Sequence, residues 1–295
     1  MSGTVVVSIQ PEWPGILETL RNEPGGIVYV MGAPDRGKST FCRYLVERLT
    51  PTRPTAYLDC DTGQSTIGPP TTIGLAIHRA PHQAAERHLR FTGSTSPHGH
   101  TLQVVAGTLR LLGKACQQGA KTVIIDSSGY ILDEPAQEFQ FQLVDLLQPD
   151  HLISFQVSDE LESILANFRH HPRMAIHRVP VPREVVVRLR GWRRTYRERQ
   201  FTEYFSEAMQ HDLSLDGIGI HGRLPPSFRP EEWSGLLIAL CDWEHEVVVL
   251  GVVDRLDLPH HTIRFLAPTF DRTTVTSIHV GSMRIEGTYS AGDQG

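Results

Sequence analysis

A lysine followed by two hydroxyl residues, at the end of a loop framed by glycines, is the first group in this chain that could do chemistry. The loop has the spacing G-x-x-x-x-G-K-S/T, in which backbone N–H groups cradle phosphate oxygens and the lysine reaches the β- and γ-phosphates. The hydroxyl that follows the lysine binds Mg²⁺ in such loops. The pattern predicts a nucleoside triphosphate site made of Gly32, Ala33, Pro34, Asp35, Arg36, Gly37, Lys38, Ser39 and Thr40.

The segments on either side of this loop are those that a phosphate-binding loop requires. The apolar run Ile27–Met31 precedes it and predicts a buried strand, and apolar residues recur at helical spacing from Phe41 to Leu49. A helix that begins at the loop points its positive N-terminal end at a bound phosphate. Strand, loop and helix in this order distinguish the motif from a glycine-rich turn that carries a lysine by chance.

Aspartates lie at or just after the ends of two further predicted strands. Asp59 ends the run 55–59 and Asp61 follows it, while Asp126 ends the run 122–126. P-loop enzymes need a carboxylate near the metal–triphosphate, either to hold the metal's water or to accept a proton from the nucleophile. We expect Asp61 to reach into the cleft and Asp59 to support the metal together with Ser39. By periodicity Asp126 is an equally good metal-side residue, and the spacing does not choose between the two.

A strongly basic segment lies later in the chain, with seven arginines against two glutamates between Arg183 and Arg199. Four of the arginines recur at helical spacing and share one face. Such a face can close over a triphosphate and stabilise charge on the transferring group, or bind a nucleic-acid backbone. Aromatic residues are interleaved with and follow these arginines, and most of them are expected to be core contacts that dock the helix and not base-stacking groups; they are Trp192, Tyr196, Phe201, Tyr204 and Phe205.

The order of apolar runs and amphipathic segments predicts an α/β fold with a mostly parallel sheet flanked by helices. The expected strands are 27–31, 55–59, 89–92, 122–126, 151–155 and 174–177, and the expected helices are 39–49, 101–118, 136–147 and 159–169. After about residue 211 the pattern changes to short β runs at 236–241, 247–253, 262–267 and 277–285. We therefore predict a P-loop domain over residues 1–210 and a smaller β-rich domain over 211–295.

Composition narrows the class of protein further. The net charge is −5, and the four cysteines are scattered without a C-x-x-C pair, which suits a reducing cytoplasm and provides no metal framework. The N-terminus lacks the basic-then-apolar pattern of a signal peptide, and no apolar run approaches the roughly 20 residues that cross a bilayer. A cytoplasmic protein without membrane contact is expected, and no segment indicates a protein partner.

Taken together, the motifs resemble those of the polynucleotide 5′-hydroxyl kinases. This family includes the kinase subunit of the eukaryotic mRNA 3′-end cleavage factor, the rRNA-processing kinases, and smaller archaeal and bacterial relatives. Beyond the P-loop, the segment 59–64 is similar to the family's D/E-x-D-x-G-Q element and 91–97 to its G-x-x-S-P segment. Residues 124–130 resemble the "clasp", T-x-G-W in many members, and 188–205 resemble the arginine-rich "lid". The resemblance covers roughly residues 25–290.

The resemblance implies specific roles for residues of this sequence. Asp61 is the implied general base beside the acceptor hydroxyl, and the implied lid residues that neutralise the migrating phosphoryl group are Arg188, Arg193 and Arg197. The implied acceptor-binding residues are Gln64, Ser127, Ser128, Gly129, Tyr130 and Arg194. The clasp departs from the family pattern, with Ser127 for threonine and Tyr130 for tryptophan, but tyrosine still offers a ring for base stacking. About thirty residues precede the P-loop, so a short bacterial or archaeal stand-alone member is expected.

The function predicted from the sequence is transfer of the γ-phosphate of ATP, or of another nucleoside triphosphate, to the 5′-hydroxyl of RNA, DNA or both, with Mg²⁺. One alternative is a small-metabolite kinase on the same scaffold, for which an arginine lid fits equally well. Another is a catalytically silent ATP-binding scaffold in RNA processing. A guanine-specific switch is not expected, because neither asparagine of the chain stands in an N-K-x-D motif.

Overall fold

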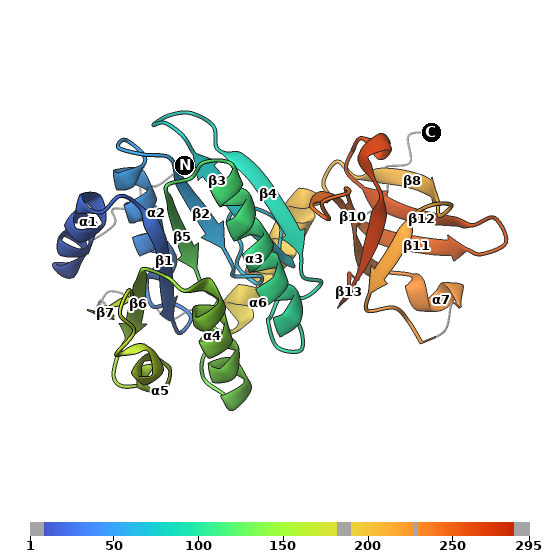
Figure 1. Ribbon diagram of the computed structural model, residues 1–295. Helices are drawn as coiled ribbons and strands as arrows, with labels where there is room; N and C mark the ends of the chain where they lie inside the picture. The colour runs from blue at the N-terminus through green and yellow to red at the C-terminus, as the bar shows by residue number, and fades with distance from the viewer. Residues whose placement is uncertain (1–8, 182–189, 227–228, 286–295) are drawn as a thin grey trace. The chain divides into compact units, whose positions relative to one another are not determined.

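The computed structural model describes residues 9–181, 190–226 and 229–285. The chain forms two compact units (Figure 1). The P-loop unit comprises Met1–Asp61, Gly74–Arg87 and Thr108–Leu189, and the C-terminal unit comprises Thr62–Ile73, His88–Gly107 and Arg190–Gly295. The basic segment from Arg190 onward therefore belongs to the same compact unit as the C-terminal strands, together with the earlier segments Thr62–Ile73 and His88–Gly107. The division predicted at residue 210 stays a prediction.

A seven-stranded sheet, in the order β4-β3-β2-β5-β1-β6-β7, carries the P-loop. The pairs from β2 through β5, β1 and β6 to β7 are parallel, and β3 runs antiparallel to β2. Its strands are β1 Gly26–Gly32, β2 Thr55–Asp59, β3 Thr72–His78, β4 Glu86–Phe91, β5 Thr122–Asp126, β6 His151–Gln156 and β7 Ala175–Pro180. Because β5 lies between β1 and β2, the carboxyl ends of these three strands meet at one edge, where ligands bind in such sheets.

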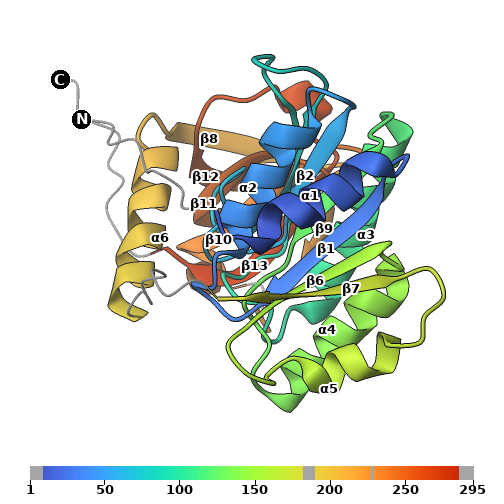
Figure 2. The ribbon, with the colours of Figure 1, turned by 90° about the vertical axis from the view of Figure 1, so that its left-hand side faces the viewer.

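Helices cover both faces of this sheet, with α1 and α2 on one face and α3 and α4 on the other (Figures 1 and 2). The helices α1 and α2 are held together by an edge-on contact between Trp13 and Phe41, whose ring centroids are 5.1 Å apart. Asp133 caps α4, because its side chain accepts a hydrogen bond of 2.8 Å from the Ala136 N–H. The bounds are α1 Glu12–Asn22, α2 Lys38–Leu49, α3 Thr101–Gln117, α4 Glu134–Leu147, α5 Glu162–Leu165 and the 3₁₀ turn η1 Ala166–Phe168.

The C-terminal unit is built on a six-stranded sheet in the order β8-β12-β11-β10-β13-β9. Its pairs are antiparallel except for β13 with β9. All six residues of the central strand β10 are buried, and they alternate between two apolar clusters. Its elements are α6 Arg190–Tyr204, β8 Met209–Ser214, β9 Gly219–Gly222, α7 Pro230–Trp233, β10 Leu236–Cys241, β11 Val247–Asp257, β12 Thr262–Ala267, η2 Arg272–Thr274 and β13 Ser277–Arg284.

The α/β class predicted from the sequence, with a β-rich C-terminal part, is confirmed. Each strand predicted from an apolar run is present, and most bounds agree within one to three residues. The sequence did not reveal α1, β3, β8, β9 or α7, and the helix expected over 159–169 is a short α5 followed by the turn η1. In the part of the chain that the structure describes, no helix has the length and apolarity needed to span a membrane.

Candidate active site

The loop Gly32–Thr40 has the backbone of a phosphate cradle. Gly37 has a φ of +92°, and α2 begins at the next residue. Gly32 has a φ of +155°, and a Cβ there would lie 2.6 Å from the carbonyl oxygen of Phe155 on the neighbouring strand β6. Both glycines of the motif are therefore required by conformation or by space. The start of the loop therefore packs against strand β6 at Phe155, and its end continues directly into the N-terminus of α2.

Lys38 is folded back over this loop. Its side chain is only 6% exposed, and Nζ donates a hydrogen bond of 3.0 Å to the carbonyl oxygen of Ala33. The ammonium thus lies within the cradle and does not extend into solvent. A buried cation at the N-terminal end of a helix is an environment that favours a polyanion.

Asp59 and Asp126 lie side by side where β2 and β5 end, because they are register partners in the sheet. Each is 1% exposed. Asp59 Oδ1 accepts a hydrogen bond of 3.0 Å from the backbone N–H of Asp61. Asp126 Oδ2 accepts one of 2.9 Å from the Tyr57 hydroxyl, while its Oδ1 is buried with no hydrogen-bond partner among the described residues. Asp59 therefore shapes the turn that carries Asp61, and Asp126 keeps one oxygen available.

The electrostatic surroundings of Asp126 fit a cation. Burial raises the pKa of Asp126, and the Lys38 ammonium and the hydroxyls of Ser39 and Tyr57 oppose that rise. An orphaned buried carboxylate oxygen near the P-loop hydroxyl is the hard oxygen donor set that Mg²⁺ prefers. The residues present thus fit a magnesium ion held on the side of Ser39 and Asp126. The predicted metal role of Asp59 stays a prediction.

We expect Asp126→Asn to raise the melting temperature of the nucleotide-free protein and to lower turnover by about 10²-fold. A raised folded-state pKa means that this carboxyl's contribution to stability is present below the pKa of the unfolded chain and is lost as pH rises through the folded-state value. Its ionised form therefore costs stability at neutral pH, and the amide removes that cost. Thermal denaturation and a turnover assay with ATP and Mg²⁺ measure the two effects. A lowered melting temperature with unchanged turnover would contradict the assignment.

The clasp segment contacts the P-loop. The Ser127 N–H donates a hydrogen bond of 3.0 Å to the Val30 carbonyl on β1, and Ser127 and Ser128 are buried. A Cβ on Gly129 would lie 2.6 Å from the backbone nitrogen of Pro34. The segment therefore lies directly against the loop at a position where only glycine fits.

The ring of Tyr130, the last clasp residue, is half-buried. The Tyr130 carbonyl accepts a hydrogen bond of 3.0 Å from Gln140 on α4, and its ring centroid lies 6.2 Å from that of Phe139. Helix α4 thus holds both the backbone and the ring of Tyr130. A ring supported in this way can serve as a stacking surface.

We expect Gly129→Ala to weaken ATP binding by at least about tenfold, since the new methyl group must displace the backbone of the P-loop or of the clasp. The matched control is Gly113→Ala in α3, where a Cβ would meet no atom within 4 Å. That change should leave ATP affinity unaltered and add about 0.5–1 kcal/mol of helix stability. Equal ATP affinity in the two variants, measured by calorimetry, would argue against the contact.

The lid and the residues after Asp61 meet within the C-terminal unit. The Tyr196 hydroxyl on α6 donates a hydrogen bond of 3.3 Å to the carbonyl of Ser65, the residue that follows Gln64. Arg193 and Arg197 are half-buried. Arg194 is exposed, and its Nε lies 2.7 Å from Glu198 Oε1. Arg188 lies outside the described residues.

The segment that resembles G-x-x-S-P is held to strand β13 of the same unit. Gly93 lies so close to Gly281 that a Cβ on it would be 2.8 Å from the Gly281 Cα. The Ser282 N–H donates a hydrogen bond of 3.0 Å to the Gly93 carbonyl, and the Ser282 hydroxyl lies 2.9 Å from His100 Nε2. In this structure, the glycine of the segment therefore serves a close approach between two backbones.

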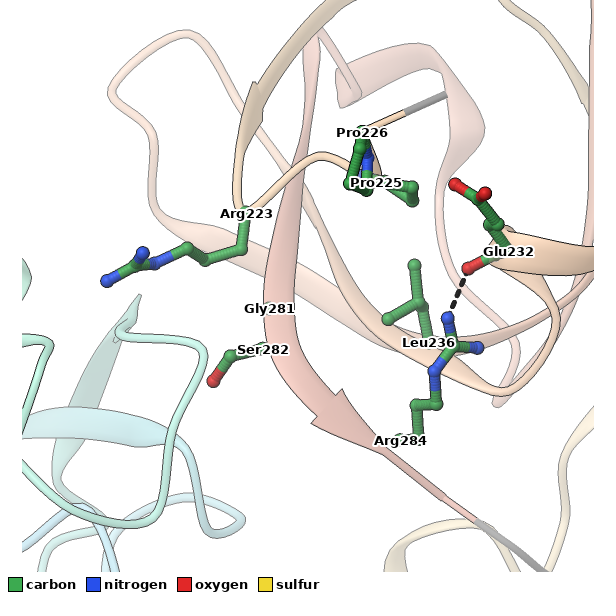
Figure 3. Close-up of a pocket in the computed structure, with 8 residues that line it drawn as sticks. All are labelled: Arg223, Pro225, Pro226, Glu232, Leu236, Gly281, Ser282 and Arg284. Carbon is green, nitrogen blue, oxygen red and sulfur yellow. Dashed lines mark hydrogen bonds between the residues drawn. The ribbon is translucent and has the colours of Figure 1, made fainter. Parts of the chain in front are cut away.

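A separate hollow of about 260 Å³ lies in the C-terminal unit (Figure 3). The two arginines that line it donate hydrogen bonds to backbone carbonyls. Arg223 donates to Gly99 over 2.7 Å, and Arg284 donates to the carbonyls of Glu232 and Ser234. The two arginines therefore bind backbone carbonyls, and the carboxylate of Glu232, which also lines the hollow, would repel an anion. The hollow is for these reasons unsuited to binding a phosphate.

Two residues that support the site were not singled out from the sequence. Tyr57 binds Asp126, and Phe155 closes the loop behind Gly32. Tyr57 stands two residues before Asp59, so strand alternation places both on one face of the sheet; this was the available signal. Phe155 carries no signal beyond an apolar strand, because its role depends on β6 lying beside β1.

A phosphate cradle, a buried lysine and paired carboxylates at the carboxyl ends of parallel strands define a P-loop nucleotide-binding protein. The chain belongs to the mRNA cleavage and polyadenylation factor CLP1 P-loop family, whose model matches residues 32–207. The family predicted from the sequence is thereby confirmed.

The sequence similarity to two archaeal relatives extends over most of the chain. It is 22% identical to a polyribonucleotide 5′-hydroxyl-kinase of Methanocaldococcus jannaschii, over 88% of this chain and 87% of the relative. It is 26% identical to one of Pyrococcus furiosus, over 88% of this chain and 76% of the relative. A solved structure of Clp1p with Pcf11p resembles it in fold, with a TM-score of 0.71 and 12% identity over 96% of this chain and 82% of that one.

Proposed function

We propose that this protein is a kinase that transfers the γ-phosphate of ATP to the 5′-hydroxyl end of RNA, DNA or both. The observation that carries the proposal is the shared strand-end edge, where Lys38 lies in the phosphate cradle and Asp59 holds the turn of Asp61. The archaeal relatives are named polyribonucleotide 5′-hydroxyl-kinases, which supports this acceptor over a small metabolite.

In the proposed reaction, the 5′-hydroxyl oxygen forms a bond to the γ-phosphorus as the bond from that phosphorus to the β,γ-bridging oxygen breaks. ADP leaves, and the proton of the hydroxyl passes to the Asp61 carboxylate. Lys38 and the loop amides hold the phosphates, which is most of what phosphoryl transfer requires of a protein. Mg²⁺, held by Ser39 with Asp126 or Asp59, would supply positive charge against the phosphate oxygens.

The lid and clasp residues have proposed roles toward the phosphoryl group and the acceptor. Arg193 and Arg197, with Arg188, neutralise charge on the migrating group as arginine fingers do. Gln64 and the clasp residues Ser127, Ser128 and Gly129 position the acceptor, and Tyr130 stacks on its terminal base. The exposed ion pair of Arg194 with Glu198 contributes little stability, so Arg194 can exchange its partner for an acceptor phosphate. Action in the cytoplasm stays a prediction.

The test is transfer of labelled γ-phosphate, with Mg²⁺, to matched single-stranded RNA and DNA oligonucleotides that carry a 5′-hydroxyl. We expect label at the 5′ end, abolished when the acceptor already carries a 5′-phosphate, and the ratio of the two rates ranks RNA against DNA. Label on a nucleoside but on neither oligonucleotide would indicate the metabolite kinase. ATP binding without any transfer would indicate the silent scaffold.

A further inference from the structure

Trp192, on the first turn of α6, is 44% exposed. Most of the aromatic residues in and after the basic segment were expected to pack in the core, and Trp192 is one that does not. Its ring lies parallel to that of Tyr196, one turn later, with centroids 5.4 Å apart and planes at 15°. A single exposed apolar side chain is common on a protein surface, so the feature that distinguishes Trp192 is its stacking on a second ring.

The C-terminal end of the helix is anchored in the core. Phe201 and Phe205, at 3% and 2% exposure, pack against the face of the C-terminal sheet that includes Leu237 and Leu250. The Leu250 N–H also donates a hydrogen bond of 2.9 Å to the Tyr204 hydroxyl. Trp192 lies twelve residues before Tyr204, or about 18 Å along the helix at its ordinary rise.

The stacked pair is held in one orientation. The Tyr196 hydroxyl donates a hydrogen bond to the carbonyl of Ser65, which fixes the direction of the tyrosine ring, and the Trp192 ring is stacked with that ring. The pair is thus ordered before any ligand arrives. A pre-ordered aromatic surface binds a planar ligand at lower entropic cost than a mobile one.

The charge around the pair favours a polyanion with planar groups. Arg193 and Arg197 follow the two aromatic residues directly in sequence, and within the described part of the chain Arg197 forms no ion pair with a carboxylate. Exposed aromatic rings interleaved with arginines are the chemistry by which proteins bind single-stranded nucleic acids, with bases stacked on rings and phosphates near the cations. An acidic protein segment would use the arginines but would leave the flat indole face without a matching group.

We propose that Trp192, supported by Tyr196, is a stacking residue for a nucleobase of the single-stranded acceptor. The inference rests on the proposed kinase function for its acceptor. It gives α6 a second role, since the helix then binds a base of the acceptor as well as neutralising the phosphoryl group. Because any base can stack, this contact contributes affinity for single strands without sequence preference.

The chain contains a built-in spectroscopic test. Of its four tryptophans, Trp13 and Trp233 are 2% and 1% exposed, whereas Trp192 and Trp243 are exposed. In a Trp243→Phe background, titration with a 5′-hydroxyl RNA oligonucleotide should quench the exposed tryptophan emission. The quench should vanish with Trp192→Phe in the same background and should weaken with an oligonucleotide of abasic sites.

Kinetics provides the second measurement. Trp192→Ala should raise the KM for the oligonucleotide by about 5- to 150-fold, as expected for the loss of one stacked base, with kcat changed far less. Trp192→Phe should restore most of the affinity, and Trp243→Ala should match the wild type. An unchanged KM in Trp192→Ala, or equal binding of the abasic strand, would overturn the inference while leaving the kinase intact. Quenching without phosphate transfer would instead contradict the proposed function alone.

Discussion

Lys38→Ala should transfer phosphate at least about 10³-fold more slowly than the wild type, the range seen when a positioned charge on a transferring phosphoryl group is lost. Lys38 is buried in the loop, with Nζ on the Ala33 carbonyl, so no solvent cation takes its place at the same position. Rates under single-turnover conditions at saturating ATP measure the loss in the transfer step itself.

The chain has three lysines, and one of them outside the P-loop provides a matched control. Lys121, exposed just before β5, can be changed to alanine without touching the P-loop, and this variant should keep the wild-type rate. The increase in melting temperature that ATP produces through ligand linkage should persist in Lys121→Ala and shrink in Lys38→Ala. Transfer by Lys38→Ala within tenfold of the wild type would show that the lysine is not the group that holds the phosphates.

The P-loop could be predicted in full from the sequence because everything that defines it is local. The strand, the two glycines and the helix after Lys38 are consecutive, and the structure places them as the pattern requires. The relation between Asp59 and Asp126 could not be predicted in this way. It depends on β5 lying between β1 and β2, and strand order is a property of long-range packing that periodicity does not encode.

The missed elements have physical reasons of their own. Helix α1 contains Pro14 and Gly15, which usually interrupt helices. Proline is tolerated in a first turn, where its missing N–H would have no partner, and buried Trp13, Ile16, Leu17 and Leu20 supply the packing energy. Strand β8 carries polar residues at most of its positions and is stabilised by pairing with β12.

The exposure of Trp192 could not be predicted from the sequence either. Helical spacing shows that Trp192 and Tyr196 share a face of α6, but it does not show which aromatic residues that helix buries. That depends on where the C-terminal sheet offers an apolar surface, and the cluster around Leu237 and Leu250 accommodates Phe201 and Phe205. Residue type alone therefore indicates that most of the five aromatic residues pack in the core, but it does not indicate which one stays exposed.

Asp61→Asn should lower kcat for 5′-hydroxyl RNA by about 10³-fold, within the range attributed to a positioned general base, and should leave ATP affinity within about threefold. The amide has the shape of the carboxylate but cannot take up the proton of the hydroxyl. The local fold should survive, because Asp59 binds the backbone N–H of residue 61 and not its side chain. Steady-state kinetics gives the first quantity and calorimetry with ATP the second, with exposed Asp145→Asn on α4 as the matched control.

Asp59→Asn distinguishes a role for Asp59 in the shape of the turn from a role in binding the metal. In that variant the side-chain amide oxygen can still accept the hydrogen bond from the N–H of Asp61, so a carboxylate that only shapes the turn can be replaced at a cost of less than about tenfold in kcat. A loss in Asp59→Asn as large as that in Asp61→Asn, relieved by raised Mg²⁺, would assign Asp59 to the metal. Wild-type turnover in Asp61→Asn would remove Asp61 as the base. The acceptor proton would then leave by a route that does not involve this carboxylate, and the turn held by Asp59 would serve the shape of the site alone.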